Sequence, residues 1–259
     1  IPFMDAHGLG ELTYMAASHY HADHCGGLDE VFNVKGVSVA VYDRGWSYTT
    51  QTYNSYASIV ASKRVTISDN QVIDMGDGVT VTCIAVNGNG ELNSPYSSSS
   101  YENDYGLALL VECGDFDFFV AGDLTGGGGS YHDIETSVGP EAGDIEVYHV
   151  SHHGSYSSSN ASFLADTNPE VSIISVGDGN SYGHPHQSVL DRLYGMGSAI
   201  YQTETGDPSN SVPGRIIANG HITITTDGSG TYEVNGDVYE MDEGAPSAVP
   251  DQGLLLHGN

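Results

Sequence analysis

Three histidines and one aspartate lie close together near the start of the chain, at His19, His21, Asp23 and His24. Imidazole and carboxylate groups are the ligands that zinc and similar divalent ions accept in proteins. On a tight loop, His19 and His21 can bind one ion while Asp23 and His24 turn toward a second ion nearby. The spacing therefore predicts a centre for two divalent metal ions, and zinc, manganese and iron are all compatible with it.

Further residues of the ligand type follow predicted strands later in the chain. Asp123 comes shortly after the strand expected at 116–120, where a carboxylate could bridge two ions. His152 and His153 follow the strand expected at 145–150. Because adjacent side chains cannot both point the same way, one of these histidines should bind metal, and the other should support it or act as an acid. The sequence leaves open which does which.

A third group of histidines follows the strand expected at 171–176. It is the run Tyr182-Gly183-His184-Pro185-His186, in which either histidine could also simply mark the start of a helix. His132 and Glu135 lie in the glycine-rich stretch after Asp123 and are weaker candidates.

The elements that must position these residues show two periodicities. Runs rich in β-branched and aromatic residues, bounded by Gly, Asp, Asn or Ser, predict strands at 12–17, 37–42, 79–85, 107–112, 116–120, 145–150 and 171–176. Apolar residues at helical spacing predict helices at 53–63 and 186–196, the second ending at Gly197. Strands and helices intermix, which predicts an α/β fold in which helices cover sheets.

We expect one domain over residues 1–243 and a loosely held Pro- and Gly-rich extension over 244–259. Within the domain, alternation around a glycine-containing turn predicts a hairpin over 222–234. Two low-complexity runs, of serine at 97–100 and of glycine at 126–129, are expected to be mobile surface loops.

The composition is strongly acidic, since 34 Asp and Glu against 6 Lys and Arg give a formal net charge of −28. Such a surface repels polyanions, and phosphate binding normally recruits Lys and Arg, so nucleic acid is disfavoured as a substrate. The charge is typical of a salty or extracellular setting, and we expect an extracellular or periplasmic location. The chain begins at Ile1 without an initiator methionine, as a processed or trimmed product would.

Neither a membrane span nor a disulfide framework is expected. No apolar run reaches the roughly 18 residues that a spanning helix needs. The cysteines are an odd, sparse set of 3, and Cys83 and Cys113 lie in apolar runs typical of core residues.

Four motifs, taken in their order along the chain, resemble the metallo-β-lactamase superfamily. They are the loop Ser18 to Leu28, the turn Gly122-Asp123-Leu124, the box His152-His153-Gly154-Ser155 and the run Ile174 to Pro185. Together they are similar to the branch that contains the hydrolase domain of the DNA-uptake competence protein ComEC, as is the segment Glu102-Asn103-Asp104. The resemblance covers roughly residues 10–205.

This resemblance implies an αββα sandwich with the site at one edge of two sheets, a dinuclear zinc or manganese centre (zinc favoured) and hydrolytic function. One histidine of the 152–153 pair, taken as His153, completes a ligand set carried over by position: His19, His21, Asp23, His24 and Asp123. His184 carries over as a ligand or as an active-site acid. His152 is the expected catalytic partner, and Asp23 is expected to orient the attacking hydroxide besides binding metal.

Two features depart from the superfamily pattern. The superfamily usually has a further histidine ligand, but no histidine occurs between His24 and His132, and Asn87 lies about where it would fall. This fits the ComEC-like branch, leaves one ion with fewer ligands and counts against a true β-lactamase. The branch also opens with a strand pair that carries an Asp-Val-Gly-x-Gly-Asp turn, which this chain lacks. Either an N-terminal piece is missing from the sequence or those strands have been lost.

We therefore expect a metal-dependent hydrolase and favour a phosphodiesterase. Two cations lower the pKa of a bound water from about 16 toward about 7, and anionic phosphate oxygens can bind to both of them. A small phosphodiester such as a phosphorylcholine ester suits an acidic, tyrosine-rich chain better than DNA does. The alternatives are a lactone, β-lactam or carboxylic ester hydrolase, and a non-catalytic metal-binding or adhesion domain on the same fold. The oligomeric state is left open.

Overall fold

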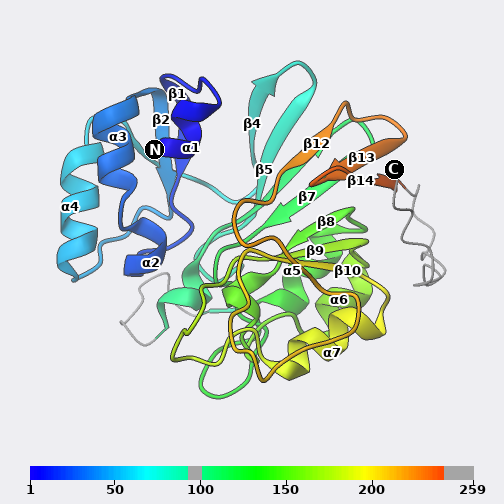
Figure 1. The fold of residues 1–259 in the computed structure, drawn as a ribbon. Helices are drawn as coiled ribbons and strands as arrows, with labels where there is room; N and C mark the ends of the chain where they lie inside the picture. Colours follow the sequence, from blue (N-terminus) through cyan, green and yellow to red (C-terminus); the bar gives the residue numbers. More distant parts are fainter. Residues whose placement is uncertain (93–100, 242–259) are drawn as a thin grey trace.

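A computed structural model describes residues 1–92 and 101–241 (Figure 1). The strands are β1 (Leu12–Ala16), β2 (Val37–Asp43), β3 (Arg64–Thr66), β4 (Gln71–Gly76), β5 (Val79–Ala85), β6 (Ala108–Cys113), β7 (Phe116–Val120), β8 (Val147–His149), β9 (Val171–Ile174), β10 (Ala199–Gln202), β11 (Ile216–Ile217), β12 (Ile224–Thr226), β13 (Thr231–Val234) and β14 (Asp237–Glu240). The helices are α1 (Pro2–Ala6), α2 (Ala22–Cys25), α3 (Leu28–Lys35), α4 (Gln51–Val60), α5 (Glu135–Ala142), α6 (Ala161–Thr167) and α7 (Gln187–Gly195), with short 3-10 turns η1 (Glu102–Tyr105) and η2 (Ser151–Gly154).

The first sheet contains β1, β2 and β3 in that order, all parallel. Helices α3 and α4 cover its outer face (Figure 1). Helix α4 begins after Thr50, whose side chain accepts a hydrogen bond from the Tyr53 backbone N–H. Tyr53, Tyr56 and Val60 recur at helical spacing and are buried against this sheet. The packing fixes β1, whose end leads into the histidine loop.

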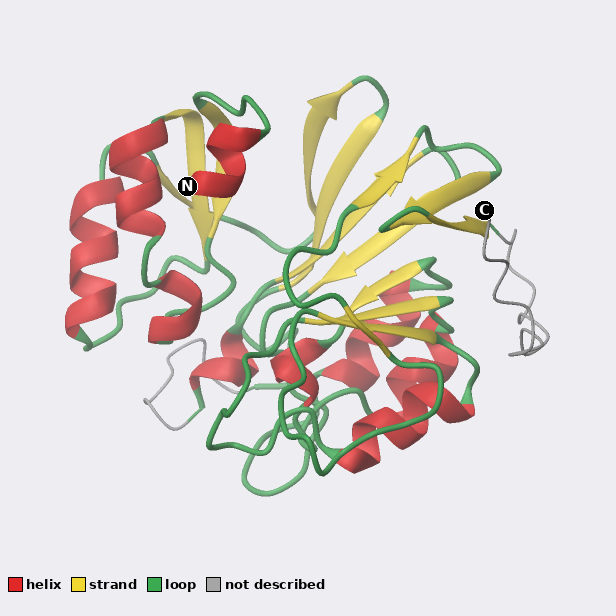
Figure 2. Ribbon diagram, in the orientation of Figure 1, coloured by secondary structure: helices red, strands yellow, loops and turns green. Residues whose placement is uncertain are grey.

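The larger sheet has the strand order β11-β10-β9-β8-β7-β6-β5-β4. Strands β4 to β7 are antiparallel, and β7 to β11 are parallel. Helices α5, α6 and α7 cover one face (Figure 2), and their residues Val138, Phe163 and Leu190 join the main core. All four residues of β9 are buried, as expected for a strand covered on both faces.

The other face of the larger sheet is covered in two parts. Near β4 and β5 it meets the first sheet, where Ile73 and Cys83 cluster with Tyr14 and Tyr42. Near β7 to β10 it meets a small sheet of β12, β13 and β14, whose Tyr232 belongs to a separate apolar cluster. The layers are therefore helices, sheet, sheet and helices, which is the expected αββα sandwich.

Many predicted elements are found. The strands at 79–85 and 116–120 have the predicted bounds, and β8 and β9 are shorter than predicted. The predicted hairpin exists and continues into a third strand, β14. The structure also has helices that were not predicted: α1, α2, α3, α5 and α6. Helix α5 contains Pro140, which weakens a helical pattern.

The glycine run at 126–129 is a surface loop whose backbone is tied to its surroundings. Gly126 forms an isolated β-bridge with Asp133 and donates its N–H to the Ser157 carbonyl. The predicted serine loop at 97–100 and the predicted extension at 244–259 lie outside the described residues. The three cysteines are free, with Cys25 and Cys83 buried. Within the described ranges, the structure has no helix that combines the length and apolar character needed to cross a bilayer.

Candidate metal centre

The histidine loop runs from the end of β1 into α2. Its middle residue, Tyr20, is fully buried among α4 side chains, and its backbone N–H donates to Glu102 Oε1 at 3.0 Å. Because Tyr20 points into the core, its neighbours His19 and His21 turn the other way, and their Nε2 and Nδ1 atoms lie 3.2 Å apart. A buried anchor therefore holds the two flanking imidazoles together.

Asp123 is brought to the same place by the turn after β7. Gly122 has a φ of +54°, and a Cβ there would lie 2.4 Å from the Ser18 Oγ. Only glycine lets this turn approach the histidine loop so closely. Asp123 is 4% exposed, and its Oδ2 lies 3.7 Å from His19 Nε2. His19, His21 and Asp123 thus form one candidate metal-binding cluster, with donor atoms all within 4.8 Å of one another.

A second cluster lies on the other side of Asp123. It consists of Asp23, His24 and His153, whose donor atoms also lie within 4.8 Å of one another. Asp23 Oδ2 lies 3.6 Å from His24 Nε2 and 3.5 Å from His153 Nε2. Asp123 Oδ1 lies 3.0 Å from His24 Nε2 and 3.6 Å from His153 Nε2. Asp123 therefore turns one carboxylate oxygen toward each cluster, which is the arrangement a bridging ligand needs.

Several donor atoms at this centre are buried and lack a hydrogen-bond partner among the described residues. They are His24 Nε2, Asp123 Oδ1 and His153 Nε2. Buried polar atoms of this kind are costly unless something satisfies them. Divalent cations would satisfy all three, so the residues fit the two ions that the sequence predicts.

Neighbouring groups orient the imidazoles. Ser18 Oγ lies 3.2 Å from His19 Nδ1, and the Ser175 carbonyl accepts from His153 Nδ1 at 2.8 Å. Each contact engages Nδ1 and leaves Nε2 directed at the centre, as is usual for histidine ligands.

The protonation states also suit metal binding. Burial raises the pKa of Asp123, but the neighbouring imidazoles of His24 and His19 outweigh it and hold that pKa well below its usual range. Burial lowers the pKa of His19, which favours the neutral imidazole. The Asp23 carboxylate raises the pKa of His153 to about 9, so metal binding must release a proton from that residue.

His152 and His153 point in different directions. Both have left-handed backbone conformations, with φ of 54°. His153 reaches the second cluster, whereas His152 Nε2 lies 3.3 Å from the Asn103 amide and 3.6 Å from Asp123 Oδ2. The predicted division of the pair into two roles is therefore geometrically possible, with His153 placed to bind metal.

His184 lies at the rim of the centre. It is 8% exposed, and its ring centroid is 5.6 Å from that of His152 and 6.0 Å from that of His153. Burial lowers its pKa to about 4, so its imidazole is neutral at pH 7 and has one N–H to donate. His186 is one step farther out, where its Nδ1 accepts from the Tyr156 backbone N–H.

Three weaker candidates have other contacts. Glu135 is fully buried and accepts the backbone N–H groups that precede α6. His132 pairs with Asp104 at 2.6 Å and is 52% exposed. Asn87, expected near the missing ligand, instead exchanges hydrogen bonds with Arg44. The turn after β5 directs the Asn87 side chain to that buried guanidinium.

The residues that sequence reasoning missed as site residues form η1. Glu102, Asn103 and Asp104 are nearly or fully buried. Glu102 holds the Tyr20 N–H, Asn103 contacts Asp123 at 3.3 Å, and Asp104 accepts from Thr125 Oγ1 at 2.6 Å. A run of three polar residues just before a buried strand was the available signal.

The basic residues are engaged away from the two clusters. Each donates to a carboxylate, carbonyl or amide oxygen elsewhere: Lys35 to Asp5, Arg44 to Glu102, Lys63 to Ser38, Arg64 to Asp43, Arg192 to Ser158 and Ser159, and Arg215 to Gln202 and Asn210. In the described part of the chain, no lysine or arginine contacts either cluster. Apart from its histidines, the site therefore offers no cationic side chain to a substrate among the described residues.

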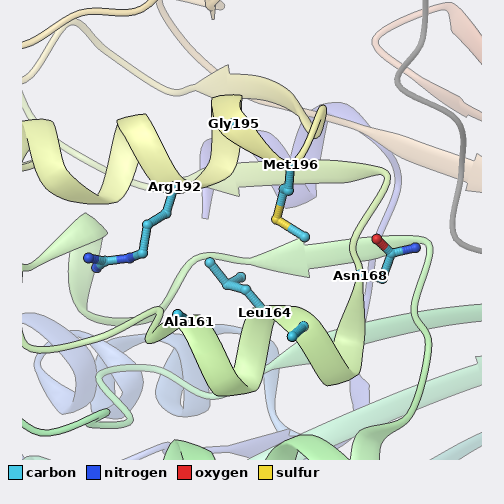
Figure 3. Close-up of a pocket in the computed structure, with 7 residues that line it drawn as sticks. Ala161, Leu164, Asn168, Arg192, Gly195 and Met196 are labelled. Atoms are coloured by element: carbon cyan, nitrogen blue, oxygen red, sulfur yellow. The ribbon is translucent and has the colours of Figure 1, made fainter.

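A cavity of about 350 Å³ lies elsewhere, between α6 and α7 (Figure 3). Its lining is Ala161, Leu164, Ala165, Asn168, Arg192, Gly195 and Met196. The Arg192 guanidinium is held by backbone carbonyls. The lining includes no member of the two clusters and no nucleophile, so we place the chemistry at the metal centre.

Residues 8–88 match the family model of the metallo-β-lactamase superfamily. The chain is 26% identical to ComE operon protein 3 of Bacillus subtilis over 79% of this chain and 25% of that protein. It is also 26% identical to competence protein ComA of Neisseria gonorrhoeae over 79% of this chain and 26% of that protein. The chain thus spans about a quarter of the length of these relatives.

Among solved structures, a mutant of the CmlA β-hydroxylase shares 11% identity, with a TM-score of 0.48 over 74% of this chain and 43% of its own. CmlA is described as a diiron enzyme from Streptomyces venezuelae. This likeness is distant.

The layers, the motif order and the family match together define the class: this chain has the metallo-β-lactamase fold, a metal-dependent hydrolase fold that implies divalent metal binding. Within that class, it resembles the ComEC-like competence proteins.

Proposed function

We propose that this protein is a metal-dependent phosphodiesterase with two divalent ions, zinc favoured and manganese the alternative. The observation that carries the proposal is Asp123, which turns Oδ2 toward His19 and Oδ1 toward His24 and His153. A carboxylate shared by two histidine-containing clusters is what a two-ion hydrolytic centre requires.

When bound, such ions supply an acidified water and positive charge for the oxygens of the reacting group. The residues of the chain position the reactants. Asp23 is 63% exposed, so its carboxylate can both bind and orient an attacking water. His184 and His152 lie next to each other at the centre and have N–H groups for an oxyanion or a leaving oxygen. In this scheme Asp23, His152 and His184 are the catalytic groups.

A small phosphodiester suits the surroundings better than a polymer. Since the basic residues are engaged elsewhere, little would offset the repulsion between a polyanion and a chain of net charge −28. Tyr182 is 75% exposed and stacks on His184, and Tyr156 is 54% exposed beside His186. Exposed tyrosine rings in an acidic surface favour a substrate with a cationic group, such as a phosphorylcholine ester.

Extracellular DNA is the other phosphodiester to consider, because one of the relatives is named competence protein ComA. We also propose a location outside the cytoplasm, which the acidic composition supports.

The test is metal content of protein purified without chelator, paired with hydrolysis of bis-p-nitrophenyl phosphate before and after chelation. Two equivalents of metal and chelator-sensitive turnover are expected, and Asp123→Asn should abolish turnover. His132→Ala, which removes a histidine outside both clusters, is the matched control and should retain the bound metal and the turnover. A phosphorylcholine ester, a short oligonucleotide, a lactone and a β-lactam are compared next. Turnover of the lactone or β-lactam alone, or no bound metal, would reject the proposal.

A further inference from the structure

The candidate site formed by His19, His21 and Asp123 has fewer strong ligands than its neighbour. It has two imidazoles and one oxygen of a shared carboxylate, whereas the neighbouring cluster also has Asp23. No histidine occurs between His24 and His132 in the sequence, and Asn87 is bonded to Arg44. An additional ligand for the first site must therefore come from later in the chain or from another residue type; His152 Nε2 lies 3.6 Å from Asp123 Oδ2, and a second candidate is an amide.

Asn103 is the residue that the fold brings to this position. It lies in η1 and is 2% exposed. One atom of its amide, placed as Nδ2, lies 3.3 Å from Asp123 Oδ2 and 3.3 Å from His152 Nε2. Its Oδ1 is buried without a hydrogen-bond partner among the described residues. The amide is thus held at the centre. The contacts there satisfy the atom placed as Nδ2 and leave Oδ1 without a hydrogen-bond partner.

The spacing matches that of ligands around a single ion. Zinc–ligand distances of about 2.0–2.2 Å in a tetrahedral site place neighbouring ligand atoms about 3.3–3.5 Å apart. Here His19 Nε2 and His21 Nδ1 are 3.2 Å apart, and His19 Nε2 and Asp123 Oδ2 are 3.7 Å apart. The Asn103 amide atom, at 3.3 Å from Asp123 Oδ2, falls in the same range.

We propose that Asn103 binds the first ion through its side-chain oxygen, an inference that rests on the proposed two-ion centre. The two ends of a side-chain amide are distinguished by their partners and not by their shape. A cation between His19, His21 and Asp123 favours the oxygen end. Amide and carboxylate oxygens are both ligands of divalent ions. With the oxygen inward, His152 Nε2–H can donate to it, which couples the expected catalytic histidine to a ligand.

Two substitutions separate a ligand from a hydrogen-bond donor. Asn103→Ala removes both ends of the amide, and Asn103→Asp keeps an oxygen but removes the N–H. Asn87→Ala, which removes a half-buried amide bonded to Arg44 and not to the centre, is the matched control. Metal content is measured together with the affinity for each ion, by competition with a chelating dye, and with the absorption spectrum of the cobalt-loaded protein.

We expect Asn103→Ala to weaken the affinity for one of the two ions by about tenfold or more. The absorption spectrum of the cobalt-loaded variant should also differ from that of the wild type. Asn103→Asp should bind that ion at least as tightly as the wild type, because a carboxylate replaces a neutral ligand. Asn87→Ala should leave both affinities unchanged.

Unchanged metal affinity in Asn103→Ala would overturn the inference. So would an Asn103→Asp variant that binds as weakly as Asn103→Ala, since the amide would then act by donating to Asp123. If Asn103→Ala does not fold, the metal affinity of Asn103→Asp is compared with that of the wild type. Weaker metal binding by Asn103→Asp would then argue against Asn103 as a ligand. Wild-type protein that binds two ions and turns over substrate keeps the proposed function intact in all these cases.

Discussion

Arg44 and Glu102 form a two-pronged ion pair in which both side chains are fully buried. Arg44 Nε donates to Glu102 Oε1 at 3.0 Å, and Nη2 donates to Oε2 at 2.7 Å. The same Oε1 accepts the Tyr20 backbone N–H of the histidine loop. Arg44 also lies over the Tyr20 ring, with its Cζ 4.9 Å from the centroid. The pair therefore connects the histidine loop to η1, so its loss should affect stability and metal binding together.

We expect Glu102→Gln to destabilise the protein by about 3–5 kcal/mol, because it leaves a buried guanidinium without its counter-charge. Metal affinity should fall as well, since Tyr20 loses a charged acceptor. The ion pair of Lys35 with the exposed Asp5 provides a control, and Asp5→Asn should cost less than about 1 kcal/mol. Urea unfolding of the metal-free proteins measures the stability cost of each of the two variants. If the two variants lose equally little free energy of unfolding, the buried pair does not have the stabilising role proposed for it.

Metal removal should lower stability more than the loss of any exposed contact. Three buried atoms at the centre have no hydrogen-bond partner among the described residues, and bound cations would satisfy them. An ion present at about 1,000 times its Kd stabilises the folded state by about 4 kcal/mol. Thermal unfolding with increasing zinc should therefore show a rising Tm, which excess chelator reverses. His24→Ala should remove most of this rise, whereas His132→Ala should not. A Tm that does not respond to zinc would argue against the centre.

The histidine loop was predictable because its information is local. His19 and His21 flank one residue that enters the core, so alternation alone places both imidazoles on the same side. The αββα layers followed from the motif resemblance, and several strands from their apolar patterns. The short helices were missed because α6 has only 7 residues and α5 includes a proline.

The placement of Asn103 was not predictable in the same way. Its contact with Asp123 joins residues 20 positions apart through the path of β6 and β7. Position after β5 suggested Asn87 instead, but Asn87 has a φ of 54°, and its side chain pairs with Arg44. Which of the two asparagines reaches the centre depends on tertiary packing that no local pattern contains.

Two carboxyl groups far from the metal centre should each contribute stability that decreases as the pH rises through the range 5 to 8. Burial raises the pKa of Asp117 to about 6 and that of Glu146 to about 7. The unfolded chain loses these protons near pH 4, so between the unfolded and folded pKa values the folded state holds more protons. Its stability is therefore greatest at the acidic end of the range and falls as these groups ionise.

Glu146→Gln should remove the contribution of Glu146 to this slope and raise stability at pH 8 by about 1–2 kcal/mol, since the amide carries no charge to bury. Denaturation of metal-free protein at pH 5, 6, 7 and 8 measures the slope. Glu240→Gln, at an exposed strand end, is the control and should follow the wild type. A Glu146→Gln variant whose stability changes with pH as that of the wild type does would refute the prediction.

His152 and His153 should separate metal binding from turnover. His153 Nε2 lies 3.5 Å from Asp23 and 3.6 Å from Asp123 in the second cluster, so His153→Ala should lose one equivalent of metal. His152 instead contacts Asn103 and lies next to His184, so His152→Ala should keep two equivalents but lower kcat by about 10²–10⁴-fold. Metal analysis and steady-state kinetics on bis-p-nitrophenyl phosphate are run on the same preparations. The reverse pattern, with metal lost from His152→Ala and retained in His153→Ala, would exchange the two roles and move the proton-donating position to the other side of Asp123.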